Sequence, residues 1–158
     1  MPEVKVRHYR PEDATPLAEL YRRSVLVLGP RFYRHEQVAA WASLAPGPDR
    51  IQARAVDGRT VLVAVDEADR ALAFADLEPD GHIGYFYAAP EAAGTGVADL
   101  LLAALEADAR ERGLVRLYVE ASEAARRFLE RHGFRTLGRR ELRIGGTPIH
   151  NYAMDKSL

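Results

Sequence analysis

The sequence contains a short apolar segment, a glycine-rich turn and a long amphipathic segment in direct succession, and this order strongly limits the possible folds. Residues 83–88 are apolar and aromatic and predict a buried strand, whereas residues 97–112 carry apolar side chains at helical spacing. Between them, Gly94 and Gly96 flank Thr95, and glycine permits positive φ angles and a close approach of the backbone to a ligand. The first amides of a helix have no partner within it, so this turn is predicted to bind an anion.

The glycine turn, residues 93–98, has two interpretations. It is either a flexible connection between strand and helix, or a phosphate site that needs few cationic side chains. The sequence lacks the P-loop pattern Gly-x-x-x-x-Gly-Lys-Ser/Thr. It also lacks a full Gly-x-Gly-x-x-Gly pattern, because Asp99 stands three residues after Gly96, where its negative charge would oppose a pyrophosphate. A nucleoside triphosphatase and a dinucleotide-dependent enzyme are therefore disfavoured.

Composition predicts a single globular domain over residues 1–158. A formal charge of −1 gives no general attraction to nucleic acid, and the lack of cysteine excludes disulfides and a covalent cysteine intermediate. No segment approaches the roughly 18 apolar residues of a membrane span, so we expect a cytoplasmic protein without membrane contact. The histidines lack zinc-site spacing, so no metal is expected, and the Gly-x-Ser-x-Gly elbow of serine hydrolases is missing.

Periodicity and turn signals predict the other elements of the fold. Helices are expected over residues 11–28, 35–43 and 50–56 and after the N-cap Ser122, and strands over 4–8, 60–65, 70–78, 82–88, 114–120, 135–144 and 147–155. The strand, helix and strand over residues 83–120 form a parallel crossover, whereas short turns join the other strands. We therefore predict an α/β fold with a mixed sheet and helices on both faces.

This order of elements resembles the GNAT superfamily of N-acetyltransferases over nearly the whole chain. The resemblance rests on the glycine turn and on two later patterns, Ala125-x-x-Phe128-Leu129-x-x-x-Gly133-Phe134 and Arg143-x-Gly145 followed by Asn151-Tyr152-x-Met154. The second pattern is similar to a small bacterial subgroup of that superfamily. The resemblance implies a mostly antiparallel sheet with a splayed parallel central pair, acetyl-CoA as cosubstrate, and a homodimer as in many relatives.

The resemblance also implies which residues hold the cofactor. The coenzyme A diphosphate is expected at the backbone of Ala93, Gly94, Thr95, Gly96, Val97 and Ala98. The N–H of Phe86 is expected to bind the acetyl carbonyl and Ala88 the pantetheine arm, with Ser122 and Phe128 on the opposite wall. Ala93 stands where the family usually has Arg or Gln, so Arg131 or Arg127 on the following helix is expected to add phosphate affinity.

The proton transfers are harder to assign. Leu129 occupies the position of the family's tyrosine thought to protonate the departing thiolate, but a thiol pKa of about 8.5 allows water to do this. An amine with a pKa of about 10.4 must lose a proton before it can attack, so the general base is harder to replace by water than the general acid. In some members of the family a carboxylate base occupies the position of His82. His82 is therefore either the general base or a solvated histidine. The subgroup's strand carboxylate falls on Gly84, and further candidates are Tyr85, Tyr87, Glu78 and Glu120.

The leading hypothesis is direct transfer of acetyl from acetyl-CoA to a primary amine in a ternary complex, with Tyr33, Trp41 and Asn151 shaping the acceptor pocket. A catalytically weak acyl-CoA sensor of the same fold is the alternative, and Leu129 and Ala93 favour it. A flavodoxin-like mononucleotide-binding protein would need a fully parallel sheet, which the predicted turns at residues 66–69 and 79–81 disfavour.

Overall fold

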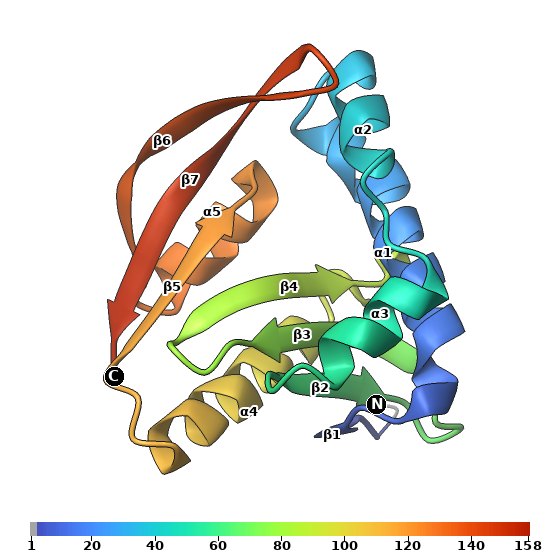
Figure 1. Ribbon diagram of the computed structural model, residues 1–158, viewed down its shortest axis with the longest axis vertical. Helices are drawn as coiled ribbons and strands as arrows, with labels where there is room; N and C mark the ends of the chain where they lie inside the picture. Colours follow the sequence, from blue (N-terminus) through green and yellow to red (C-terminus); the bar gives the residue numbers. More distant parts are fainter. Residues whose placement is uncertain (1–2) are drawn as a thin grey trace.

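The computed structural model describes residues 3–158 and contains one seven-stranded sheet (Figure 1). Its strands are β1 (Lys5–His8), β2 (Thr60–Val65), β3 (Ala71–Leu77), β4 (His82–Ala88), β5 (Arg116–Ala121), β6 (Arg135–Ile144) and β7 (Thr147–Ser157). They lie in the order β1-β2-β3-β4-β5-β7-β6, and every neighbouring pair is antiparallel except β4 and β5. The predicted mixed, mostly antiparallel sheet is confirmed.

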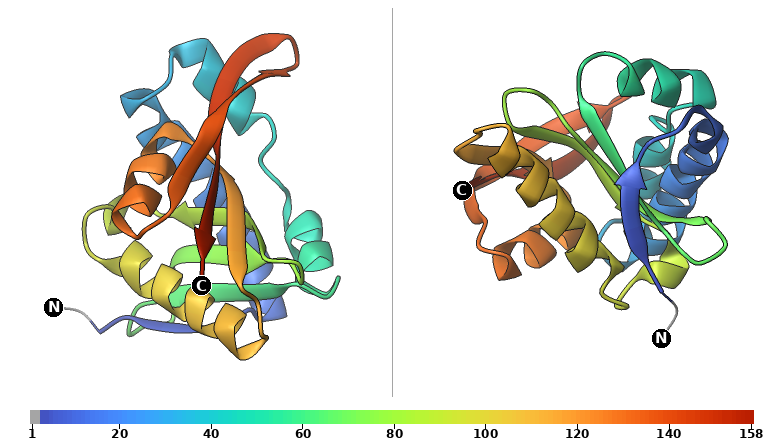
Figure 2. Two further views of the ribbon diagram at one scale, coloured as in Figure 1. Left: turned by 90° about the vertical axis from the view of Figure 1, so that its left-hand side faces the viewer. Right: turned by 90° about the horizontal axis from the view of Figure 1, so that it is seen from below.

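Helices cover both faces of this sheet, as predicted. The helical elements are η1 (Pro11–Asp13), α1 (Ala14–Leu28), η2 (Gly29–Arg31), α2 (His35–Ala42), α3 (Pro48–Ala55), η3 (Pro90–Ala92), α4 (Val97–Glu111) and α5 (Glu123–Arg131). Helix α1 packs on β3 and β4, whereas α4 packs on β1, β2 and β3 from the opposite face (Figure 2). Because both faces of β2 are covered, all of its residues are buried, which explains its nearly continuous apolar sequence.

The parallel pair β4 and β5 divides the sheet into two halves. The two strands are paired at His82–Tyr118 and Ile83–Val119 and then separate, so that β1–β4 and β5, β7 and β6 diverge (Figure 1). The hairpin of β6 and β7 rises from this junction and reaches α2, where Gln37 Nε2 donates to the Pro148 carbonyl at 3.2 Å. The expected splayed central pair is therefore present.

Glycine caps determine where helices α4 and α5 end. Gly113 and Gly133 have φ angles of 77° and 87°, and the residue after each donates its N–H back into the helix. Leu114 donates to the Ala109 carbonyl and Phe134 to the Leu129 carbonyl, both at 3.0 Å. This is the Schellman arrangement. Leu114 thus belongs to a helix cap, which explains why β5 begins at Arg116 instead of the predicted residue 114.

Within residues 3–158, no helix combines the length and apolarity that crossing a membrane requires.

Candidate active site

A β-bulge in β4 is supported by the buried carboxylate of Asp76. The register between β3 and β4 shifts between Ala75 and Leu77, and Asp76 Oδ1 accepts the N–H of Tyr85 at 3.2 Å. Arg54 Nη2 donates to Asp76 Oδ2 at 2.8 Å, so the carboxylate, whose side chain is 2% exposed, has a charged partner. Burial of this charge is therefore compensated by an ion pair and a hydrogen bond to the bulge.

Gly84 leaves the space that the Asp76 carboxylate occupies. A Cβ atom at position 84 would lie 2.3 Å from Asp76 Oδ1 and 2.6 Å from Arg54 Nη2. A side chain here would have to displace the Asp76–Arg54 ion pair, so glycine is the residue that suits this bulge. The carboxylate that the subgroup usually carries at this position is absent from β4, and a carboxylate of the neighbouring strand fills its place.

Beyond the bulge, part of the β4 backbone faces the opening between the two half-sheets. The Ala89 N–H donates to the Leu72 carbonyl in β3 at 2.8 Å, and Tyr87 pairs with Phe74 in the same register. Backbone groups alternate in direction along an antiparallel strand. The N–H groups of Phe86 and Ala88 therefore point away from β3, toward β5, at positions beyond the paired part of β4 and β5.

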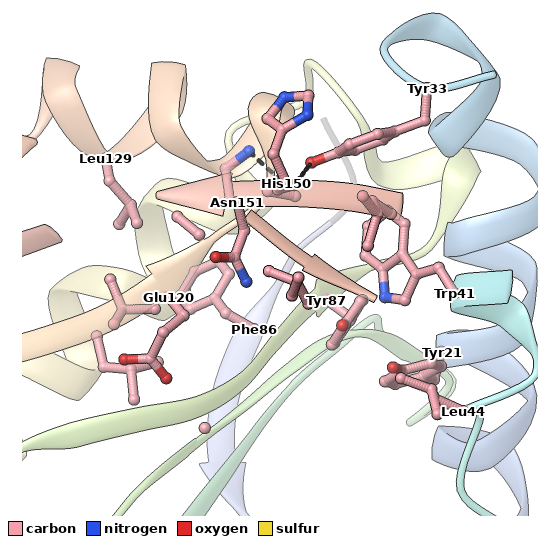
Figure 3. A pocket seen from close by; sticks show the side chains of 18 of the residues that line it. Tyr21, Tyr33, Trp41, Leu44, Phe86, Tyr87, Glu120, Leu129, His150 and Asn151 are labelled. Atoms are coloured by element: carbon pink, nitrogen blue, oxygen red, sulfur yellow. Dashed lines mark hydrogen bonds between the residues drawn. The ribbon is translucent and has the colours of Figure 1, made fainter. Parts of the chain in front are cut away.

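A central cavity of about 200 Å³ fills the opening between the half-sheets (Figure 3). Six of the predicted site residues line it, namely Tyr33, Trp41, Phe86, Ser122, Phe128 and Asn151. The predicted residues outside its lining are His82, Tyr85, Ala88, residues 93–98 and Arg131. The cavity therefore joins the predicted acetyl end of the cofactor to the predicted acceptor residues, while the glycine turn lies outside it.

His82 lies between two carboxylates behind the cavity wall. Its Nδ1 contacts Glu78 Oε2, and its Nε2 lies 2.8 Å from Glu120 Oε1. Burial lowers the pKa of His82, but the hydrogen bonds to Glu120 and Glu78 raise it, and the net result lies above the usual value. Glu120 lines the cavity, so it separates the imidazole from the space that an acceptor would occupy.

The two tyrosines of β4 differ in position. The ring of Tyr85 packs against the Arg54 guanidinium, 3.8 Å from ring centroid to Cζ, and does not line the cavity. Tyr87 lines the cavity and packs against Tyr21 with ring centroids 4.2 Å apart and planes inclined by 39°. Burial raises the pKa of Tyr87 well above its usual value, so its phenol remains protonated. Tyr87 thus offers a neutral, largely apolar surface.

The glycine turn has the conformation that an anion site requires. Gly94 and Gly96 have φ angles of 74° and 89°. The first intrahelical bond runs from the Leu100 N–H to the Gly96 carbonyl at 3.2 Å, so the amides of Val97 and Ala98 precede the hydrogen-bonded part of α4. The Thr95 N–H, however, donates to the Ala92 carbonyl at 3.2 Å. Thr95 is thereby engaged in the turn itself.

Helix α5 connects the glycine turn to the cavity. The ring of Phe128 lies 5.7 Å from Phe86 and 4.7 Å from His132, measured between centroids. His132 Nε2 lies 2.7 Å from Asp99 Oδ1 in the first turn of α4. His132 was not predicted to contribute, and it gives Asp99 a partner beside the proposed anion site. Arg131 is exposed at the end of α5.

Tyr33 uses its hydroxyl to join three segments that are distant in sequence. It donates to the His150 carbonyl at 3.0 Å and accepts the N–H of Glu123 at 3.1 Å. The Glu123 carboxylate in turn accepts from His150 Nε2 and from the Tyr152 hydroxyl, both at 2.6 Å. Tyr33 therefore faces the cavity with its ring, and its hydroxyl holds β7, α5 and the segment after η2 together.

Sequence reasoning did not single out several residues that line the cavity. These are Tyr21, Leu44, Leu142, Ile144, Ile149 and His150. Leu142 and Ile144 alternate with charged residues in β6, so one face of an otherwise polar hairpin is apolar. This alternation was the signal in the sequence that could have identified Leu142 and Ile144. It does not tell, however, which element their apolar face packs against.

A sheet that opens between two parallel strands, with backbone donors in the opening and a glycine turn before the next helix, defines the class of acetyltransferases with the GNAT fold. The chain belongs to the GNAT acetyltransferase family, since residues 31–156 match the family described as "Acetyltransferase (GNAT) domain". The family expected from the sequence motifs is thereby confirmed.

Individual relatives match over nearly their full lengths. The chain is 28% identical over 154 residues to the uncharacterized N-acetyltransferase YafP of Escherichia coli, covering 98% of this chain and 96% of YafP. A GCN5-related N-acetyltransferase structure from Rhodopseudomonas palustris is 34% identical, with a TM-score of 0.89, over 100% of this chain and 98% of that chain. YncA of Salmonella typhimurium, solved with its cofactor acetyl-CoA, shares the fold at 20% identity and a TM-score of 0.76, over 99% and 94% of the two chains.

Proposed function

We propose that this protein is an acetyl-CoA-dependent N-acetyltransferase that transfers the acetyl group directly to a primary amine in a ternary complex. One observation carries the proposal. The N–H of Phe86 points into the opening between β4 and β5, next to a cavity that extends to aromatic side chains of α1 and α2. A donor in that position suits the carbonyl oxygen of a thioester, and the cavity leaves room for an acceptor beside it.

The cofactor would lie along the opening with its diphosphate at the start of α4. The amides of Gly94, Gly96, Val97 and Ala98 suit the phosphates, because helix alignment places partial positive charge at that end. The Ala88 backbone suits the pantetheine arm, with Ser122 and Phe128 across the opening. Ala93 lacks the charge usual in the family, so most of the phosphate affinity would come from backbone groups, with Arg131 or Arg127 on α5 adding to it.

The chemistry needs no covalent enzyme intermediate. The amine lone pair attacks the thioester carbon, the carbonyl oxygen gains negative charge, and the carbon–sulfur bond then breaks. The Phe86 N–H would stabilise that oxygen, and removal of such a donor from other enzymes costs about 3 kcal/mol. An ammonium acceptor gives up two protons in total, one of which ends on the departing sulfur while the other is released.

Glu120 and His82 are proposed to act together on the acceptor proton. Glu120 faces the cavity and attracts the ammonium, and the 2.8 Å contact with His82 Nε2 provides a route for the proton. A base is most effective when its pKa is near the working pH. Because both neighbouring carboxylates raise the pKa of His82, this imidazole is a better proton acceptor than an isolated carboxylate.

The departing thiolate has no acid at the position usual in the family. Leu129 lines the cavity there, and its side chain cannot donate a proton. The thiolate would take its proton from water, which requires little driving force because a thiol has a pKa of about 8.5. The same leucine favours the alternative function, an acyl-CoA sensor that binds its ligand without turnover.

A thiol-release assay combined with calorimetry separates these functions. Purified protein is mixed with acetyl-CoA and a panel of primary amines, and free CoA is measured over time. Amine-dependent CoA release, together with an acetylated product of the expected mass, supports the transferase. Tight binding of acetyl-CoA without release supports the sensor, and the absence of binding heat contradicts both.

A further inference from the structure

The part of the cavity farthest from α5 is formed mainly by aromatic rings. Trp41 lies 5.7 Å from Tyr33 and 6.3 Å from Tyr87, measured between ring centroids, and the ring of Tyr21 packs against Tyr87 (Figure 3). Leu44 completes this wall at the end of α2. The hydroxyl of Tyr33 is occupied by His150 and Glu123. This end of the cavity therefore presents mostly apolar surface to a bound molecule.

The charges in the cavity are few and of one sign. Among the residues that line it, Glu120 is the acidic one, and none is arginine or lysine. His150 also lines the cavity, but its Nε2 lies 2.6 Å from the Glu123 carboxylate, which compensates any charge on the ring. Arg54, on the nearby bulge, is paired with Asp76 at 2.8 Å. An anionic group of a ligand would therefore meet no arginine or lysine among the described residues that line the cavity, and it would lie close to Glu120.

The same inventory limits the number of positive charges that an acceptor can bring. Glu120 can balance one ammonium, and a second ammonium on a longer acceptor would lie against Trp41 or Tyr87. An unpaired charge on apolar surface is costly to desolvate. The cavity volume of about 200 Å³ is also below the range of about 300–1,000 Å³ found for pockets of drug-sized ligands, so the acceptor is small.

We propose that the acceptor is a small primary monoamine with an apolar, aromatic body and no carboxylate or phosphate group. The ammonium lies at Glu120, and the body packs against Trp41 and Tyr87 on the cavity wall. This inference rests on the proposed acetyltransferase function and specifies the substrate class of the same site. It excludes free amino acids and polyamines as preferred acceptors.

Matched amines test the inference in the thiol-release assay. The probes are 2-phenylethylamine, L-phenylalanine, L-phenylalaninamide and spermidine. L-Phenylalanine adds a carboxylate to 2-phenylethylamine, and the amide keeps the size of that group without its charge. We expect kcat/KM for L-phenylalanine to be at least about 100-fold lower than for the amide, because the carboxylate would be buried without a partner.

A charge introduced at the cavity mouth tests the cause of this selectivity. Leu44→Arg places a guanidinium on the cavity wall and should raise kcat/KM for L-phenylalanine relative to 2-phenylethylamine by about 10-fold or more. Leu137→Arg is the matched control, since Leu137 lies on β6 outside the lining and is 52% exposed, close to the 49% of Leu44. The control should leave the ratio unchanged.

The outcomes of these assays test the substrate class separately from the proposed acetyltransferase function. Preference for 2-phenylethylamine and L-phenylalaninamide supports the inference. If L-phenylalanine or spermidine is the better substrate, the substrate class is overturned while the transferase function stands. If none of these four amines releases CoA but another amine of the panel does, the substrate class is likewise overturned. If acetyl-CoA binds and no amine of the panel releases CoA, the proposed function fails and the inference fails with it.

Discussion

The two sides of the central opening are built in different ways. The proposed cofactor side consists of backbone groups, namely the N–H groups of Phe86 and Ala88 in β4 and those at the start of α4. The acceptor side consists of side chains from α1, α2 and β7, with Trp41 and Asn151 on elements far apart in sequence. One side depends on chain conformation and the other on residue identity.

This difference separates what is shared from what is particular to this protein. Backbone donors are available whatever side chains are present, so Ala93 and Thr95 need not resemble the family's usual residues for the turn to bind phosphate. The acceptor side changes with every substitution of a lining side chain. We therefore expect cofactor binding to respond to changes in backbone geometry and acceptor choice to respond to changes in side chains.

The largest effect is expected for Glu120→Gln. Loss of this carboxylate removes the group that attracts the ammonium and contacts His82, so kcat should fall by about 100- to 10,000-fold. Steady-state kinetics should show little change in KM for acetyl-CoA. Glu141→Gln is the control, because the Glu141 side chain is 70% exposed on β6, and it should behave as wild type. Equal kcat values for the two variants would exclude Glu120 from proton transfer.

Asp76→Ala should have the next largest effect, on stability. The change leaves Arg54 and Arg59 without the buried carboxylate that they share, and breaking such a pair costs about 3–5 kcal/mol. Urea unfolding measures the loss. Surviving folded protein should show a raised KM for acetyl-CoA, because the bulge before Phe86 loses its support. A loss below about 0.5 kcal/mol, the range of surface changes, would contradict this role.

Gly96→Ala should weaken the cofactor side moderately. A Cβ atom at position 96 meets nothing within 4 Å, so its cost comes from the φ angle of 89° and amounts to about 1–2 kcal/mol. The melting temperature should fall by about 2–8 °C, and KM for acetyl-CoA should rise. Gly138→Ala is the matched control, since Gly138 has equal space and is not among the glycines with positive φ. Identical melting curves for both variants would refute the argument.

Trp41→Ala should produce the opposite kinetic pattern from Gly96→Ala. Aromatic contacts contribute about 0.5–1.5 kcal/mol beyond buried area, so KM for an aromatic amine should rise by about 2- to 10-fold. KM for acetyl-CoA should stay constant, because Trp41 lies on the acceptor side. Initial-rate measurements with each substrate varied in turn provide the test. A change confined to acetyl-CoA would show that the two sides are assigned wrongly.

The smallest effect concerns the pH dependence of stability. Because Glu120 and Glu78 raise the pKa of His82 in the folded state, its contribution is fully present below the unfolded pKa of about 6.5 and is lost as pH rises through the folded pKa. His82→Gln should therefore destabilise the protein more at about pH 6 than at about pH 9. Urea unfolding at both values measures this, with exposed His35→Gln as control. A pH-independent difference would contradict it.

The sequence predicted the conformation of the glycine turn and the neighbouring helix ends because local signals determine it. Gly94, Gly96 and Gly113 mark the turn and the helix end through φ angles that other residues rarely adopt, and Ser122 caps α5 by accepting the Ala125 N–H at 3.3 Å. The strand bounds of β2 and β4 were predicted correctly for the same reason, since alternation and turns limit them.

The lining of the cavity on the proposed acceptor side was predicted only in part, because it depends on long-range packing. Trp41 was identified as a lining residue, whereas Tyr21 and Ile144 were not, because nothing in the sequence tells which faces of α1 and β6 meet across the opening. The contact of His82 with Glu120 follows from the pairing of His82 with Tyr118 in the parallel strands. Such a register between distant segments is not encoded locally.

The fit between Gly84 and Asp76 has a consequence for how related chains can vary. A side chain at position 84 would overlap the Asp76 carboxylate in its present place. A carboxylate at position 84 and a carboxylate at position 76 therefore do not fit together. A carboxylate can move from β3 to β4 only if glycine or alanine replaces Asp76 at the same time. We therefore expect positions 76 and 84 to change together in related chains, because either change alone would be selected against.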